Sequence, residues 1–163
     1  MVVDAGALDL VSMATAPLVV TPHAGEFARL RSGLGLAEAP EGLARADRAA
    51  VVIETAHALG GTVVLKGAET IVADEEGALI VIEAHVSWLA VAGTGDVLSG
   101  MIGALVAANS GASLAEAAAA AVWLHAEAGA LSAGVRADAP GHPVVAIEVA
   151  EAVPAVIAQV LAR

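Results

Sequence analysis

The string AGTGDVLSG at residues 92–100 combines the residue types needed to hold a phosphate and to remove a proton. Two glycines around a small threonine allow a tight turn, so consecutive backbone N–H groups at a helix start can point at one anion, which the helix dipole also favours. Asp96, in the first turn, could act as general base toward a hydroxyl that attacks a phosphoryl group held there. The alternative is an ordinary glycine loop with Asp96 as a favourable helix-start carboxylate, because short glycine patterns are weak evidence.

Two more polar strings follow apolar, strand-like runs. Lys66, the only lysine of the chain, comes directly after residues 62–65, and His23 and Glu26 follow residues 18–20. Ligands bind at the carboxyl ends of strands in open α/β sheets, where a lysine can meet a nucleotide phosphate. The alternatives without a role in binding are that Lys66 is a solvated lysine at a turn, and that His23 and Glu26 mark a helix start in which Glu26 lies near the helix dipole.

The elements that must position these strings alternate between strands and helices. The β-branched runs predict strands at residues 2–3, 18–20 and 62–65, and a hairpin of residues 70–72 with 78–82. Helical spacing predicts helices at residues 8–14, 39–59, 93–108, 113–131 and 147–161, the last kinked or broken at Pro154. This order indicates an α/β protein with a mainly parallel sheet and helices on both faces.

Composition excludes several classes of protein. The 163 residues suit one domain, and 58% hydrophobic residues argue against disorder. A net charge of −11 and only three aromatic residues disfavour binding to nucleic acid and to anionic membranes. The absence of cysteine excludes disulfides, thiolate metal sites and a cysteine nucleophile.

The compartment and the remaining histidines carry weaker signals. The N-terminus lacks the positive region of a signal peptide, and the most apolar stretch, residues 97–108, is too short to span a bilayer. We therefore expect a cytoplasmic protein that does not bind membranes. Four histidines show no metal-ligand spacing and are interpreted as core-edge or surface residues: His57, His85, His125 and His142.

Three motifs in fixed order carry a family resemblance. TPHAGE at residues 21–26, VLKGAET at 64–70 and AGTGDVLSG at 92–100 resemble the ADP/ATP-dependent NAD(P)H-hydrate dehydratases of the ribokinase-like superfamily. The resemblance continues through Ala107 and the Trp-Leu-His string at residues 123–125 to the C-terminal helix. It implies a three-layer α/β/α ribokinase-like fold, with residues 1–163 as a single, partial domain.

The resemblance also implies a truncation. The DA-x-x-L stretch, here residues 4–8, lies in the middle of the family's domain. We therefore expect this chain to correspond to the C-terminal portion of that domain, without several N-terminal strands and helices. An exposed sheet edge would follow, which self-association could cover.

The function implied by the resemblance is metabolite repair. The reaction is an ADP- or ATP-dependent dehydration, catalysed by a lyase: the nucleotide phosphorylates the added hydroxyl of NADHX or NADPHX, and phosphate then leaves to restore NADH or NADPH, with AMP or ADP as the other product. Magnesium is expected, without direct protein ligands. The expected partners are the hydrated dinucleotide, an adenine nucleotide and further copies of the chain, a tetramer being one form.

Residue roles are carried over by position. Asp96 would be the base and contact the substrate, with an anion hole formed by Gly93, Thr94 and Gly95. His23 would contact the hydrated dinucleotide, with Glu26 in support. The adenine nucleotide would be held by Gly95 and by the consecutive residues Lys66, Gly67, Ala68, Glu69 and Thr70.

Two other functions stay open. A ribokinase-like small-molecule kinase would share the glycine loop and the base but release a stable phosphorylated product. A nucleotide-binding module without turnover would keep the motifs alone. The TPHAGE string favours the dehydratase, because it belongs to that family's pattern.

Overall fold

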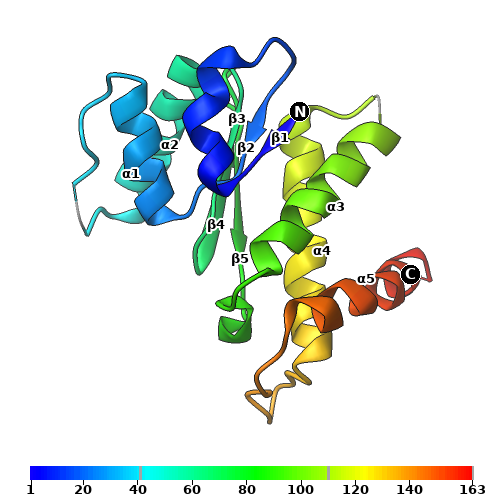
Figure 1. The fold of residues 1–163 in the computed structure, drawn as a ribbon. Coiled ribbons are helices and arrows are strands. Elements are labelled where there is room, and N and C mark those ends of the chain that lie inside the picture. Colours follow the sequence, from blue (N-terminus) through cyan, green and yellow to red (C-terminus); the bar gives the residue numbers. More distant parts are fainter. Residues whose placement is uncertain (41, 110, 163) are drawn as a thin grey trace.

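A computed structural model of the chain describes residues 1–40, 42–109 and 111–162. Its centre is a five-stranded sheet with the order β1-β2-β3-β4-β5 (Figure 1). The strands are β1 (Val2–Val3), β2 (Val19–Val20), β3 (Thr62–Leu65), β4 (Glu69–Ala73) and β5 (Leu79–Glu83). β1, β2 and β3 are parallel, whereas β3–β4 and β4–β5 pair antiparallel, so the sheet is mixed.

Helices cover both faces of the sheet (Figure 1). One side carries the 3-10 helix η1 (Ala5–Met13) with α1 (Ala24–Gly33) and α2 (Arg45–Leu59). The other carries α3 (Thr94–Ala108) and α4 (Leu114–Ser132); α5 (Ala146–Leu161) and the short η2 (Ser87–Leu89) contact α4. The expected three-layer α/β/α architecture is confirmed.

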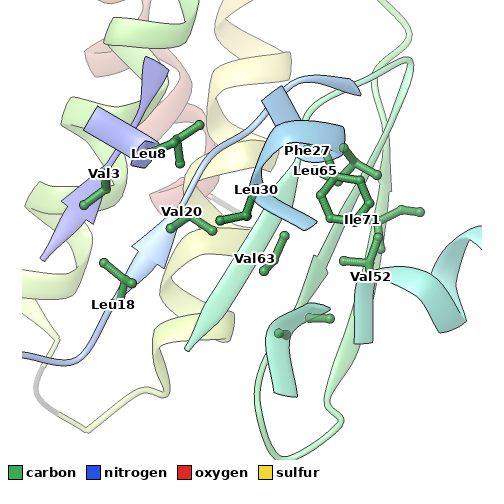
Figure 2. Packing of buried hydrophobic residues seen from close by; sticks show 12 residues of the cluster. Val3, Leu8, Leu18, Val20, Phe27, Leu30, Val52, Val63, Leu65 and Ile71 are labelled. Carbon is green, nitrogen blue, oxygen red and sulfur yellow. The ribbon is translucent and has the colours of Figure 1, made fainter. Parts of the chain in front are cut away.

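Alternating side chains of the strands build the two cores. In β3, Val63 and Leu65 join the cluster beneath α1 and α2, whereas Val64 joins the cluster beneath α3 and α4. Figure 2 shows the first cluster, in which Phe27 from α1 and Val52 from α2 pack toward the sheet. All three β3 residues are buried, as expected for a strand covered on both faces.

Several predicted boundaries need correction. α1 was foreseen only as an alternative helix start at His23 and Glu26, without bounds, and α2 begins at Arg45 and not near residue 39. Gly42 adopts a left-handed φ of 69°, which no helix interior accommodates; Glu41 lies outside the described residues. The helix predicted for residues 8–14 is η1, shifted toward the N-terminus. α5 continues through Pro154, so the proline does not divide it. Among the described helices, none has the length and apolar character to cross a membrane.

Candidate active site

Three strand ends and one helix start meet at one edge of the sheet. Because β1, β2 and β3 are parallel, the residues that follow them, Asp4, Thr21 and Lys66, lie at the same end. Lys66 Nζ donates to Asp4 Oδ1 at 2.8 Å. Ser99 Oγ, from α3, donates to Asp4 Oδ2 at 3.0 Å and lies 3.3 Å from Thr21 Oγ1. Asp4 therefore ties the lysine to α3.

Each oxygen of the Asp4 carboxylate accepts a hydrogen bond from a side chain. Its side chain is 14% exposed, and this burial alone would raise its pKa. Hydrogen bonds from Lys66 and Thr21, together with the Lys66 charge, outweigh burial and lower the pKa below its ordinary value. Asp4 consequently holds Lys66 in place and is poorly suited to accept a proton from a substrate.

The N-terminus of α3 is left open beside that lysine. Its N-cap, Gly93, has a φ of 88° and offers no side chain to the helix amides. In the described residues, the N–H groups of Thr94, Gly95 and Asp96 have no backbone acceptor; the first α3 amide that does is Val97, which donates to Gly93. Three free amides at the positive end of a helix dipole form an anion site.

Lys66 and Asp96 flank these amides. A methyl group added to Gly95 would lie 3.3 Å from Lys66 Nζ and 3.6 Å from Asp4 Oδ2, so glycine keeps this approach open. The Asp96 carboxylate is exposed, and none of the hydrogen bonds or ion pairs found among the described residues involves its side chain. One anion could therefore meet the amides and the ammonium group while Asp96 stays free to take a proton.

The predicted pair His23 and Glu26 forms the start of α1. His23 Nδ1 accepts from the Gly25 amide at 3.0 Å and the Glu26 amide at 3.4 Å, and Glu26 Oε2 accepts from the His23 amide at 2.8 Å. This is a capping box, so the helix-start interpretation of these residues is confirmed. The imidazole remains 60% exposed, and its Nε2 lies 3.4 Å from Glu26 Oε1. Contact with a substrate stays a prediction.

The residues after Lys66 form the turn into β4. Glu69 makes ion pairs with Arg45 at 2.8 Å and Arg48 at 2.6 Å, both close to or on the first turn of α2. The Thr70 hydroxyl donates to the Gly67 carbonyl at 3.3 Å and is buried. Within residues 66–70, Lys66 reaches the α3 terminus and residues 67–68 are exposed, whereas Glu69 and Thr70 hold the turn.

Sequence reasoning assigned no site role to Asp4, Thr21 or Ser99. The signal for Asp4 and Thr21 was present, because each directly follows a predicted parallel strand, as Lys66 does. Ser99 stands three residues after Asp96, which brings it to the same face of α3. Only the packing of α3 against β1 shows that its hydroxyl reaches Asp4.

The layered α/β fold, with a free helix N-terminus, a lysine and an exposed carboxylate at the strand ends, is that of ribokinase-like proteins. The family model described as NAD(P)H-hydrate dehydratase (Carb_kinase) matches residues 1–142. The chain belongs to the NAD(P)H-hydrate dehydratase family.

Individual relatives agree with this assignment. The bifunctional NAD(P)H-hydrate repair enzyme Nnr of Mycobacterium leprae is 50% identical over 125 residues, 77% of this chain and 24% of that protein. The ADP-dependent (S)-NAD(P)H-hydrate dehydratase of Neisseria meningitidis is 45% identical over 108 residues, 66% of this chain and 34% of that protein.

The fold has solved counterparts. The ADP/ATP-dependent NAD(P)H-hydrate dehydratase of Bacillus subtilis, co-crystallised with ATP and Mg²⁺, superposes with a TM-score of 0.77 at 29% identity, over 97% of this chain and 54% of that one. The chain thus spans about half the length of this structure and a quarter to a third of the two curated relatives.

Proposed function

We propose that this chain takes part in the ADP- or ATP-dependent dehydration of NADHX and NADPHX, with release of AMP or ADP and phosphate. The observation that carries the proposal is the convergence of Lys66, Asp4 and Ser99 on the uncapped start of α3. The names of the Neisseria and Bacillus relatives support the choice of substrate and nucleotide.

The anion site would bind the phosphoryl group that is transferred. The amides of Thr94, Gly95 and Asp96 and the Lys66 ammonium group supply fixed positive charge where phosphoryl charge must be neutralised. Their positions are set before any ligand binds, because Asp4 and Ser99 hold the lysine and α3 together. Such preorganisation lowers the barrier of phosphoryl transfer.

Asp96 would accept the proton of the substrate hydroxyl. As this O–H bond breaks, the hydroxyl oxygen forms a bond to the terminal phosphorus of the nucleotide, and the bond from that phosphorus to its bridging oxygen breaks to release AMP or ADP. In the second step, the C–O bond to the new phosphate breaks and a ring proton is lost, which restores the dihydronicotinamide. Asp4 is the weaker candidate for the base, because Lys66 and Ser99 already occupy its oxygens.

Mg²⁺ would bind at this site together with the nucleotide. In the part of the chain that the structure describes, no three His, Asp or Glu side chains cluster to hold a metal ion. Mg²⁺ keeps several waters and is bound in such sites through phosphates and one or two carboxylates. The nucleotide phosphates would hold the ion beside α3, and the ion would supply further positive charge to the transferred group.

His23 and the turn after Lys66 would complete the contacts. The exposed His23 ring stands at the adjacent strand end, where the Lys66 amide donates to the Pro22 carbonyl at 2.8 Å. It could therefore contact the hydrated dinucleotide while it caps α1. Gly67 and Ala68, which are exposed, could meet the adenine nucleotide, whereas Glu69 and Thr70 would act by holding that turn.

The proposal is tested by incubating the purified chain with hydrated NADH, Mg²⁺ and ADP and following dihydronicotinamide absorbance against a control without nucleotide. Recovery of absorbance that depends on ADP or ATP supports the dehydratase. A stable phosphorylated product would indicate a kinase. Thermal stabilisation by ADP without turnover would indicate a nucleotide-binding module. No binding and no turnover would reject the proposal.

A further inference from the structure

Four charged side chains meet beside the turn that follows Lys66. Arg48 Nη2 donates to Glu69 Oε2 at 2.6 Å, and Arg45 Nη2 lies 2.8 Å from the other carboxylate oxygen, Oε1. Arg45 Nη2 also donates to Glu83 Oε1 at 2.5 Å. We call the two arginines and the two glutamates the arginine clamp; it joins the first turn of α2 to the start of β4 and the end of β5.

Stability alone is a weak reason for the clamp. The chain has seven basic against eighteen acidic residues, and two of those seven lie here. The Arg45 and Arg48 side chains are 52% and 41% exposed, and ion pairs this exposed add little to the free energy of folding. The Arg48 Nε is also buried without a hydrogen-bond partner among the described residues, which carries a desolvation cost. The turn that the clamp holds offers a better reason.

The clamp spans both strands that flank this turn. Glu69 opens β4 directly after Ala68, and Glu83 closes β5 directly before Ala84. The two glutamates stand opposite each other in the antiparallel pair, where like charges repel. Arg45 binds both carboxylates and so turns this repulsion into an attachment to α2. Because the Ala84 amide donates to the Ala68 carbonyl at 2.9 Å, both strand ends determine how Ala68 is oriented.

The turn itself has paired carbonyls and unpaired amides. The Gly67 carbonyl accepts from the Thr70 hydroxyl at 3.3 Å, and the Ala68 carbonyl is held as described. Among the hydrogen bonds found in the described residues, none has the Gly67 or Ala68 amide as donor, and both residues are exposed. The turn is tight, since a methyl group added to Gly67 would lie 3.2 Å from the Glu69 carbonyl oxygen. The orientation of Glu69 therefore bears directly on these two free amides.

We propose that Arg45 and Arg48 are positioning residues, which fix the free amides of residues 67–68 for the adenine nucleotide. The inference rests on the proposed function of that turn. Neither arginine touches substrate in this role; both act through Glu69, holding one carboxylate oxygen each. A binding group whose direction is set beforehand loses less entropy when the ligand arrives.

The test compares two variants that change charge in opposite directions. Arg48→Met removes a positive charge and Glu69→Met a negative one, and each breaks the clamp. We expect both to raise the dissociation constant of Mg²⁺-ADP about five- to tenfold, as loss of one well-oriented hydrogen bond predicts; calorimetric titration measures it. If charge alone mattered, Glu69→Met would bind the anionic nucleotide more tightly. Arg29→Met, at an exposed position of α1, is the control and should match wild type.

NMR relaxation supplies a readout that needs neither ligand nor turnover. Backbone order parameters at Gly67 and Ala68 should be near the rigid value of about 0.85 in the wild type and fall toward about 0.6 in Arg48→Met and Glu69→Met. Val64, in the middle of β3, should keep its value in all variants. Arg48→Lys, which can still pair with Glu69, should restore most of the order at the turn.

Three results would overturn the inference: Glu69→Met that binds ADP as tightly as wild type or more tightly, order parameters that stay unchanged at residues 67–68, or a fall that extends equally to Val64. A wild-type chain that binds no ADP would reject the proposed function. The order parameters would then still decide whether the clamp holds the turn.

Discussion

Two helices begin at the same edge of the sheet, and their N-termini are built in opposite ways. α1 is closed by its own side chains: His23 Nδ1 accepts two of its amides, and Glu26 accepts the His23 amide. α3 starts at Gly93, which has no side chain to offer, and leaves its first three amides free. A free N-terminus is a ready anion site, and a capped one is not.

The difference assigns distinct tasks to the two helix starts. At α3, the backbone itself would bind phosphate, with Lys66 alongside and Asp96 as a free carboxylate. At α1, His23 Nδ1 already accepts from the Gly25 and Glu26 amides, while the ring itself remains exposed and could meet a ligand. The His-x-x-Glu string is therefore first a structural cap, and any contact with substrate is added to that role.

The largest expected effect lies at the open helix. Asp96→Asn removes the base while it preserves the backbone, so turnover should fall about 10²- to 10⁴-fold while ADP still binds. Steady-state kinetics and calorimetric titration with ADP separate these two quantities. Full activity in Asp96→Asn would show that another group takes the proton, and Asp4 would be the next residue to change.

Lys66→Met should weaken nucleotide binding next most strongly. Loss of a charge-assisted hydrogen bond to phosphate costs about 1.5–3 kcal/mol, which is about a 10- to 100-fold change in the ADP dissociation constant. Arg29→Met serves as a control, because Arg29 carries the same charge, is exposed on α1 and takes part in none of the ion pairs found among the described residues. Equal effects of the two variants would reduce the role of Lys66 to general electrostatics.

The pH dependence of stability should report the Asp4–Lys66 pair. Because the Asp4 pKa is lowered in the folded protein, the carboxylate contributes stability above its unfolded pKa of about 3.9, and that contribution is lost as pH falls through the folded value. In Lys66→Met, burial remains without its partner, so the Asp4 pKa should rise above the ordinary value. Carboxyl NMR titration of both proteins measures the shift; an Asp4 pKa that stays low without Lys66 would contradict this assignment.

The smallest effect is expected at the capped helix. His23→Ala should reduce the free energy of unfolding by about 1 kcal/mol through loss of the cap, whereas His23→Asn, another good N-cap, should retain most of it. Urea denaturation measures this difference. If both variants are as stable as wild type, the cap contributes little; if both lose activity while His23→Asn stays stable, the ring has a further role in substrate binding.

The strands and the three motif loops could be predicted because their signals are local. Residues 62–65 are a β-branched run that ends at Lys66, and the observed β3 has those bounds. The start of α1 was only an alternative, because its N-cap is a histidine, outside the usual Ser, Thr, Asp and Asn. Its extent was not predicted, because Gly25 and Gly33 weaken the helical pattern. Gly42 delays α2 through a backbone conformation that spacing alone does not reveal.

For a related reason, only some residues of the site could be predicted from the sequence. Lys66, Asp96 and the glycines stand out by residue type next to a strand end or a helix start. Asp4 and Ser99 lie 95 residues apart in the chain, and their hydrogen bond depends on how α3 packs against β1. His125 was interpreted as a residue of the core edge or surface, whereas it is 8% exposed, because burial is a property of tertiary packing that spacing on α4 does not encode.

The contrast between the two helix starts is tested most directly by two-dimensional amide NMR during titration with Mg²⁺ and ADP. We expect the largest shifts at Thr94, Gly95 and Asp96, and much smaller ones at the Gly25 and Glu26 amides, which His23 already occupies. Unmoved amides at the start of α3, under conditions in which calorimetry detects bound ADP, would contradict the anion site.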